Sequence, residues 1–305
     1  TTLFRSGCNH TMTKLKKLTF HLPYFQVVTP FLISLKEFLA NHQILESLSL
    51  NYEGDELSED DHALMIQCIA SLPSLQKAHI SYNWCTVTPS QDVVIQPKIQ
   101  RRACLKVADI NICSTQIAPE ALSMTITRWA NKKWLTQFTM IILNCQSFGP
   151  EQFGLLSKTL QGFKALEKLT LRVSPNYDVS EPERLEFYSL FDSFKVLTCL
   201  ILEIKPHLGN MTDYDLRVLG SKLQDLDNLE YLELLFDSHY DISDKGCQEL
   251  FQGISHLRKL KEFILLIDKK KSVTDISVQS LRECLANLTL LKDLSIKIVK
   301  RSEEH

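Results

Sequence analysis

The chain has 305 residues, of which 44% are hydrophobic and 23% charged, with 34 basic against 36 acidic side chains. This balance argues against a nucleic-acid-binding protein, which needs an excess of basic residues on one face. No run of about 18 apolar residues occurs, so the sequence predicts no membrane-spanning helix and no membrane partner. Length alone would favour two domains rather than one compact core.

Nine cysteines are scattered along the chain, and no Cys-x-x-Cys pair occurs among them. Disulfide frameworks and structural zinc sites need close, paired spacing. We therefore interpret the cysteines as free thiols of a reducing compartment, most of them small core residues. This pattern predicts an intracellular, cytoplasmic protein, for which a cytoskeletal or other large assembly is one setting.

The hexad Leu-x-x-φ-x-φ, in which φ is an apolar residue, occurs ten times between residues 15 and 296. Its first leucines are separated by 30 to 32 residues. Each hexad predicts a short strand whose fixed apolar positions point into a core, because alternate side chains of a strand face the same side. The strands are predicted to start near Leu15, Leu45, Leu75, Leu105, Leu135, Leu166, Leu197, Leu229, Leu260 and Leu291.

A helix is predicted in each segment between two hexads, because apolar residues there recur at helical spacing. The helix starts agree from repeat to repeat, with a cap followed by proline or an acid. These starts are Thr29-Pro30, Ser58-Glu59, Thr88-Pro89, Ala118-Pro119, Gly149-Pro150, Glu181-Pro182, Thr212-Asp213, Ser243-Asp244 and Thr274-Asp275. In the third interval, Pro97 is predicted to kink or shorten the helix.

This pattern resembles the leucine-rich-repeat family, and its long repeat looks most like the ribonuclease-inhibitor-like subclass. The resemblance covers about residues 15–298 and implies an α/β solenoid, with parallel strands on a concave face and helices on a convex face. Many family members carry Asn or Cys at the ninth position of the repeat, where only Asn83 and Cys113 fit here. We therefore expect a divergent member with irregular strand-to-helix turns.

Stacked repeats bury one continuous core, because each repeat contacts only its neighbours. We therefore predict a single domain in which residues 15–299 form ten repeats. Residues 1–14 would form an N-terminal segment and residues 300–305 a charged tail. Neither end shows an obvious cap, and an exposed end strand is a liability. Either the chain continues or a partner covers an end.

Three residues of catalytic type fall at the same position of adjacent predicted strands. Ser49, His79 and Asp109 have the residue types of a nucleophile, a base and an orienting acid. The other interpretation is a polar row on a solvated face, which we favour because nothing nearby suggests an oxyanion hole. We therefore predict that the protein is not an enzyme and has no catalytic residues.

The sequence predicts no cofactor and no metal. It contains no glycine-rich phosphate loop, and neither His42 nor His62 has a partner at metal-ligand spacing. The tryptophans flank predicted strands, and we interpret them as core or edge packing: Trp84, Trp129 and Trp134.

The outward positions of repeats seven to nine combine apolar and acidic residues. Six apolar or aromatic side chains, with Tyr231 near their middle, are expected to be edged by acids. An exposed apolar patch with a charged rim is typical of a partner site. The predicted partner-binding residues, the concave patch, are Cys199, Ile201, Glu203, Tyr231, Glu233, Leu235, Glu262, Ile264 and Leu266. Two alternatives are cover by the chain itself and an error in register or exposure.

We therefore expect a scaffold or structural subunit of a larger intracellular hetero-complex, which binds a protein partner through the concave patch. One alternative is a substrate receptor of a ubiquitin ligase, although an F-box would not fit in the 14 residues before the first repeat. Another is an inhibitor, or a GTPase activator resembling the Ran-activating family. That family has a similar fold, but no stretch matches it beyond the repeat.

Overall fold

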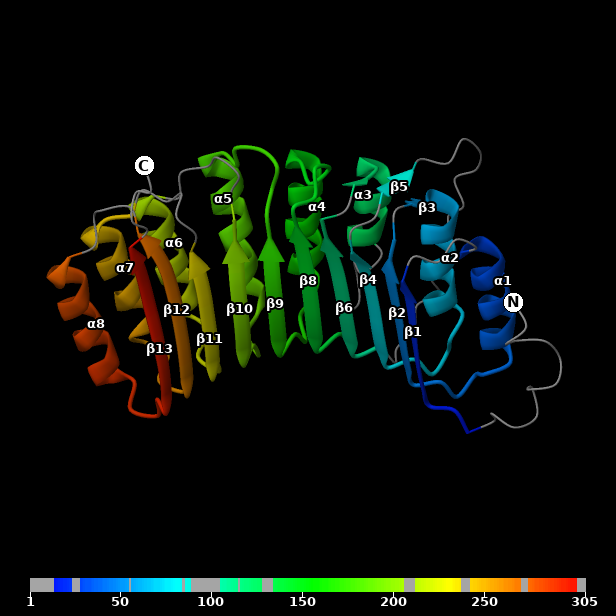
Figure 1. The fold of residues 1–305 in the computed structure, drawn as a ribbon. Helices are drawn as coiled ribbons and strands as arrows, with labels where there is room; N and C mark the ends of the chain where they lie inside the picture. Colours follow the sequence, from blue (N-terminus) through cyan, green and yellow to red (C-terminus); the bar gives the residue numbers. More distant parts are fainter. Residues whose placement is uncertain are drawn as a thin grey trace.

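The structure, a computed structural model, describes residues 14–23, 28–54, 56–83, 86–88, 105–114, 116–127, 134–205, 212–236, 242–269 and 274–300. Strands and helices alternate along these ranges (Figure 1). The kink predicted at Pro97 lies outside them. No helix in the described ranges is long and apolar enough to cross a membrane.

The main sheet contains ten described strands, and every neighbouring pair is parallel. In order across the sheet they are β1 Lys17–Pro23, β2 Ser47–Glu53, β4 Lys77–Asn83, β6 Val107–Cys113, β8 Gln137–Leu143, β9 Lys168–Val173, β10 Cys199–Ile204, β11 Tyr231–Phe236, β12 Glu262–Lys269 and β13 Asp293–Lys300. Each strand begins two residues after the first leucine of its hexad. Hydrogen bonds between neighbouring repeats begin one residue before the strands. Before β1 and β2, for example, the amides of Glu46 and Ser47 both donate to the carbonyl of Lys16.

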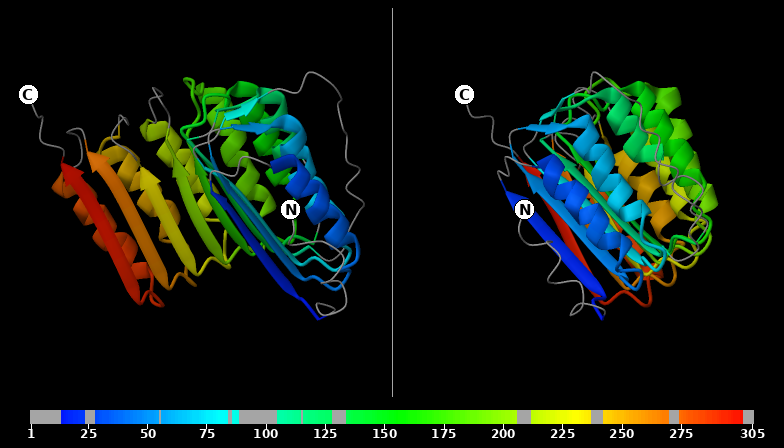
Figure 2. Two further views of the ribbon diagram at one scale, coloured as in Figure 1. Left: turned by 45° about the vertical axis from the view of Figure 1, so that its right-hand side comes forward. Right: turned by 90° about the vertical axis from the view of Figure 1, so that its right-hand side faces the viewer.

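The helices all cover one face of this sheet, and both views in Figure 2 leave the other face free of helices. They are α1 Val28–Ala40, α2 Glu59–Ala70, α3 Pro119–Thr127, α4 Pro150–Gln161, α5 Glu181–Tyr188, α6 Asp213–Leu223, α7 Asp244–Ile254 and α8 Asp275–Asn287. A 3-10 helix, η1, follows α5 over Ser189–Ser193. The helices at the two ends fan out beyond the sheet in Figure 1. This is a leucine-rich-repeat solenoid, and the predicted fold class is confirmed.

The core lies between the sheet and the helices. In β8, Phe138, Met140 and Ile142 are buried, whereas the residues between them are only half-buried. The same alternation recurs in β2, β6 and β11. Because each fully buried side chain of this size stabilises the fold by about 1.5–3 kcal/mol, the inward rows of the sheet hold the stack together.

The turns from strand to helix differ along the chain, in agreement with the expected irregularity. In the first repeats a small parallel sheet joins them, formed by β3 Glu56–Ser58, β5 Thr86–Thr88 and β7 Gln116–Ile117. Just after β6 and β8, Ser114 and Asn144 have positive φ angles of 51° and 54°. Asparagine tolerates this left-handed conformation better than most residues.

The predicted capping residues begin several helices. Thr212, Ser243 and Thr274 are the N-caps of α6, α7 and α8, as the sequence predicts. In α5 the cap is Ser180, one residue before the predicted Glu181. Ser180 caps this helix in a capping box with Glu183. Its amide and hydroxyl both donate hydrogen bonds to the Glu183 carboxylate, at 2.8 and 2.6 Å.

The acid that follows a cap also binds the cap of the next repeat. Asp213 accepts a hydrogen bond of 2.7 Å from the Ser243 amide and another from the Ser243 hydroxyl. Asp244 in turn accepts from the amide and hydroxyl of Thr274 at 2.8 and 2.6 Å, and from Ser277. Hydrogen bonds from the Ser277 and Thr274 side chains lower the pKa of Asp244 to about 2.

Replacing Asp244 with alanine should destabilise the protein at neutral pH, and this difference should vanish in acid. The folded pKa lies below the unfolded value of about 3.9, so the stabilisation is present above that value. It is lost as the pH falls towards about 2. Thermal unfolding of both proteins across this pH range tests the claim. A difference in melting temperature that persists unchanged at the acid end would contradict it.

Three glycines allow α6 and α7 to approach closely. A Cβ atom at Gly253 would overlap the carbonyl of Gly220, and one at Gly220 would lie 2.7 Å from the carbonyl oxygen of Glu249. A Cβ atom at Gly246 would overlap Asp213. In α4, by contrast, a Cβ atom at Gly154 would meet nothing within 4 Å.

Gly253→Ala should therefore lower the free energy of unfolding by about 1–3 kcal/mol, because the added methyl group overpacks two backbones. Gly154→Ala is the matched control. It should leave stability unchanged or raise it by up to about 1 kcal/mol, because alanine is the better helix former. Urea unfolding of the two variants measures both changes. Equal stability of the two would refute the close approach.

Candidate functional site on the concave face

The nine residues of the concave patch form a three-by-three grid on β10, β11 and β12. The parallel register aligns Cys199, Tyr231 and Glu262 in the first row. The second row contains Ile201, Glu233 and Ile264, and the third contains Glu203, Leu235 and Leu266. The inward neighbours of these residues are buried, so the grid lies on the face of the sheet that the helices leave free.

The apolar members of the grid are less exposed than the sequence suggests. Ile201, Leu235, Ile264 and Leu266 are half-buried, because outward side chains on strands this close shield one another. Tyr231 is half-buried as well. The patch is therefore a shallow, tightly packed surface.

Glu233 lies at the centre of the patch and not at its rim, whereas Glu203 lies at a corner of the grid and is buried there. An arginine that the prediction left out reaches across β10 from β9: Arg172 Nη2 lies 2.9 Å from Glu233 Oε1. Its Nη1 lies 3.7 Å from Glu203 Oε2, and Lys205 Nζ lies 2.9 Å from Glu203 Oε1. Only 6% of Glu203 is exposed, which these cations make tolerable.

Tyr231 is fixed by the same network. Its hydroxyl donates a 2.8 Å hydrogen bond to Glu233 Oε2, while Arg172 binds the other oxygen of that carboxylate. Burial, followed by the hydrogen bond to Glu233, raises the pKa of Tyr231 to about 12. Burial also raises the pKa of Cys199. Both groups are therefore protonated at neutral pH, and the site offers contact surface more than a nucleophile.

The polar row expected on the first strands is present. Ser49, His79 and Asp109 are register neighbours on β2, β4 and β6. Burial lowers the pKa of His79, although the nearby Asp109 acts in the opposite direction. Among the described residues, no hydrogen bond joins these three side chains, so the geometry provides none of the contacts that a catalytic triad uses. Within the same residues, no group of three or more His, Cys, Asp or Glu side chains is arranged to hold a metal.

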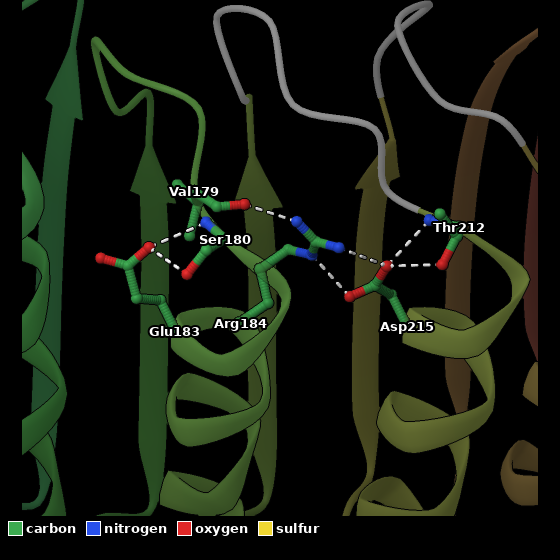
Figure 3. A network of polar contacts seen from close by, with 6 residues as sticks. All are labelled: Val179, Ser180, Glu183, Arg184, Thr212 and Asp215. Atoms are coloured by element: carbon green, nitrogen blue, oxygen red, sulfur yellow. Dashed lines mark hydrogen bonds and ion pairs between the residues drawn. The ribbon is translucent and has the colours of Figure 1, made fainter.

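A second polar network lies where α5 and α6 begin (Figure 3). Arg184 donates to Asp215 through Nε at 2.6 Å and Nη2 at 3.2 Å, and its Nη1 donates to the carbonyl of Val179. Asp215 also accepts from the amide and hydroxyl of Thr212. Asp215 is fully buried and its contacts are internal to the fold, so this network joins two repeats and is not a ligand site.

No family model matches the sequence, and no curated protein matches it either. Among solved structures, the fold is similar to a chain in the crystal structure of a TLR13–ssRNA13 complex. The two chains share 11% sequence identity, with a TM-score of 0.37. The match covers 93% of this chain and 44% of that one, so this chain spans less than half the length of its structural neighbour. The fold assignment rests on the sheet topology, and this likeness adds nothing about function.

Arg184→Ala should lower the free energy of unfolding by about 3 kcal/mol or more, because it leaves the buried Asp215 carboxylate without its cation. The control is Lys222→Ala, which removes a partly exposed ion pair of 2.7 Å with Asp192. That loss should be below about 1 kcal/mol. Chemical denaturation of both variants gives the two values. Similar losses would show that the Arg184 network does not join the repeats as described.

Proposed function

We propose that this protein is a non-catalytic scaffold that holds a protein partner on the concave patch. The observation that carries the proposal is the grid itself, which presents half-buried apolar side chains and a fixed tyrosine on the free face of the sheet. Fold alone does not assign a function, so the argument depends on these side chains.

The ion network prepares the patch for binding. Arg172, Glu203, Glu233 and Tyr231 hold one another in place before any partner arrives. A partner that covers them therefore loses less side-chain entropy than it would against mobile groups. Tyrosine and arginine are also the residue types that most often dominate binding energy at protein interfaces.

The apolar side chains supply the remaining driving force. Leu266 lies beside Leu235 in the third row, and Ile201 and Ile264 lie on either side of Glu233 in the second. A partner would remove the exposed part of each apolar side chain from water. Glu262 is exposed at the edge of the first row, next to Asp293 of β13. A partner that places a basic residue there would gain charge complementarity at the rim.

Three further predictions from the sequence are included in this proposal. They are the ten ribonuclease-inhibitor-like repeats over residues 15–299, the segments 1–14 and 300–305 outside them, and a cytoplasmic hetero-complex as the setting. No described residue favours a ubiquitin-ligase receptor or a GTPase regulator over a structural subunit. The scaffold is therefore proposed without a named assembly.

The combined variant Tyr231→Ala and Leu235→Asp should abolish capture of the specific partner. It removes the tyrosine of the first row and places an acid beside Glu203. Both side chains are half-buried, so circular dichroism must show that the variant remains folded before its capture is compared. The control is Val107→Ala with Asn111→Asp on β6, at the register positions equivalent to Tyr231 and Leu235 but not adjacent to Arg172. Quantitative mass spectrometry after affinity capture compares the two with the unaltered chain. If the patch variant and the control capture the same proteins in the same amounts, the patch is not the binding site.

A further inference from the structure

One edge of the solenoid is lined by two-residue turn tips, where each helix has ended and the next strand is about to begin. In the described residues these tips include 43–44, 73–74, 164–165, 195–196, 227–228, 258–259 and 289–290, and Trp134 lies at the equivalent place. We call this row the turn edge. It follows the lower ends of the strands in Figure 1. It contains none of the concave patch residues.

Apolar side chains are exposed at four of these tips. The exposed fraction is 46% for Ile44, 65% for Trp134, 43% for Val196 and 50% for Leu290. All four occupy the same position, directly before the first leucine of a hexad. Turn tips normally carry Gly, Pro, Asn, Asp or Ser, so large apolar residues at one repeated tip position are not explained by the turns themselves. Trp134 in particular is not a core residue, which was one of the two roles expected from the sequence.

Basic residues are interspersed with these apolar tips. Lys164 and Lys195 precede Ala165 and Val196 on neighbouring repeats, and Arg258 and Lys259 form another tip. All four cations are exposed, and none forms an ion pair with an acid among the described residues. Lys164 and Lys259 donate only to neutral oxygens, of Ser193 at 3.0 Å and Asn228 at 2.7 Å.

The strand register brings the two kinds of tip together. Gln137, Lys168 and Cys199 are aligned on β8, β9 and β10, so the residues three positions earlier are aligned as well. These are Trp134, Ala165 and Val196. Trp134 is therefore in one row with Ala165 and Val196, and Lys164 and Lys195 each precede a residue of that row by one position.

We propose that the turn edge binds the surface of a lipid bilayer that contains anionic headgroups. Trp134 and Val196 would enter the interface between headgroups and acyl chains, where tryptophan is preferred. Lys164, Lys195, Arg258 and Lys259 would face the anionic headgroups. Contact of this kind is peripheral and needs no membrane-spanning helix. It revises the expectation of no membrane partner, which depended only on the lack of a long apolar run.

A bilayer suits this edge better than a protein partner does. The apolar tips are separated by polar and charged ones, mostly cationic with Asp227 the one acid among the described tips, so they do not form the continuous apolar core of a protein interface. Lysine is depleted at protein interfaces, whereas it is attracted to anionic lipid surfaces. Helix C-termini also favour nearby cations, which accounts for lysines on this edge but not for the exposed tryptophan.

Sedimentation with lipid vesicles tests the proposal. The intact chain should bind vesicles of phosphatidylcholine with phosphatidylserine and bind pure phosphatidylcholine vesicles much more weakly. Trp134→Ser with Val196→Ser should remove most of this binding. Lys164→Ser with Lys195→Ser should weaken it by about fivefold for each lysine. The control is Ile276→Ser with Val278→Ser, whose apolar side chains in α8 are 56% and 55% exposed but lie away from the turn edge; it should bind as the intact chain does.

Three outcomes would overturn the proposal. The first is equal binding of the intact chain to both kinds of vesicle, or binding to neither. The second is unchanged binding by the Trp134 and Val196 variant, with circular dichroism showing that it is folded. The third is self-association of the intact chain that this variant abolishes, without vesicle binding, which would assign the edge to a protein interface. Tryptophan fluorescence gives independent support if a blue shift on vesicle addition disappears in Trp134→Phe.

Discussion

The structure depends on the burial of one short apolar strand face in each repeat from β2 to β12, whereas the faces of the end strands β1 and β13 are only partly covered. The inward side chains of β2, Leu48, Leu50 and Tyr52, are almost completely buried, although a single strand and its helix could not enclose them alone. Neighbouring repeats complete the enclosure, so the repeat cannot be stable in isolation. This requirement fixes the spacing of the hexads and brings equivalent residues of successive repeats to within about 4.8 Å in the sheet. Every surface of the molecule is therefore a set of rows, each built from one position of the repeat.

That regularity is why much of the fold and part of the site could be predicted from the sequence. The hexad spacing predicted the alignment of Tyr231 with Cys199 and Glu262, and the register has this alignment. The caps of α6, α7 and α8 could be predicted because a Ser or Thr side chain accepts a hydrogen bond from a free amide in the first turn of its own helix, so the signal is local in the sequence. Glu181 was the wrong cap of α5, since the capping box of Ser180 with Glu183 depends on local geometry that the repeat alignment alone does not give.

The interactions that the sequence did not reveal connect different repeats through long side chains. Arg172 binds Glu233 across an intervening strand, at a separation of 61 residues. Their positions in the repeat place both side chains on the concave face. These positions do not show which of several cations binds which acid. The same holds for Asp213 and Ser243, and for Gly220 and Gly253, where the close approach of two helices decides the contact. Such contacts depend on the actual distance between neighbouring repeats, which the sequence pattern does not give.

The rows also explain how the two proposed binding surfaces can coexist on one chain. Outward strand positions form the concave patch, and turn tips form the turn edge, while the inward positions that stabilise the fold belong to neither. Tyr231 and Trp134 are therefore free to change without disturbing the leucines beside them. If both surfaces are occupied together, a protein partner on the free face of the sheet would be held next to a membrane at the edge of that sheet. The scaffold would then fix the position of its partner relative to the bilayer as well as bind it, and the strand length between the turn edge and the concave patch would set the distance between the two.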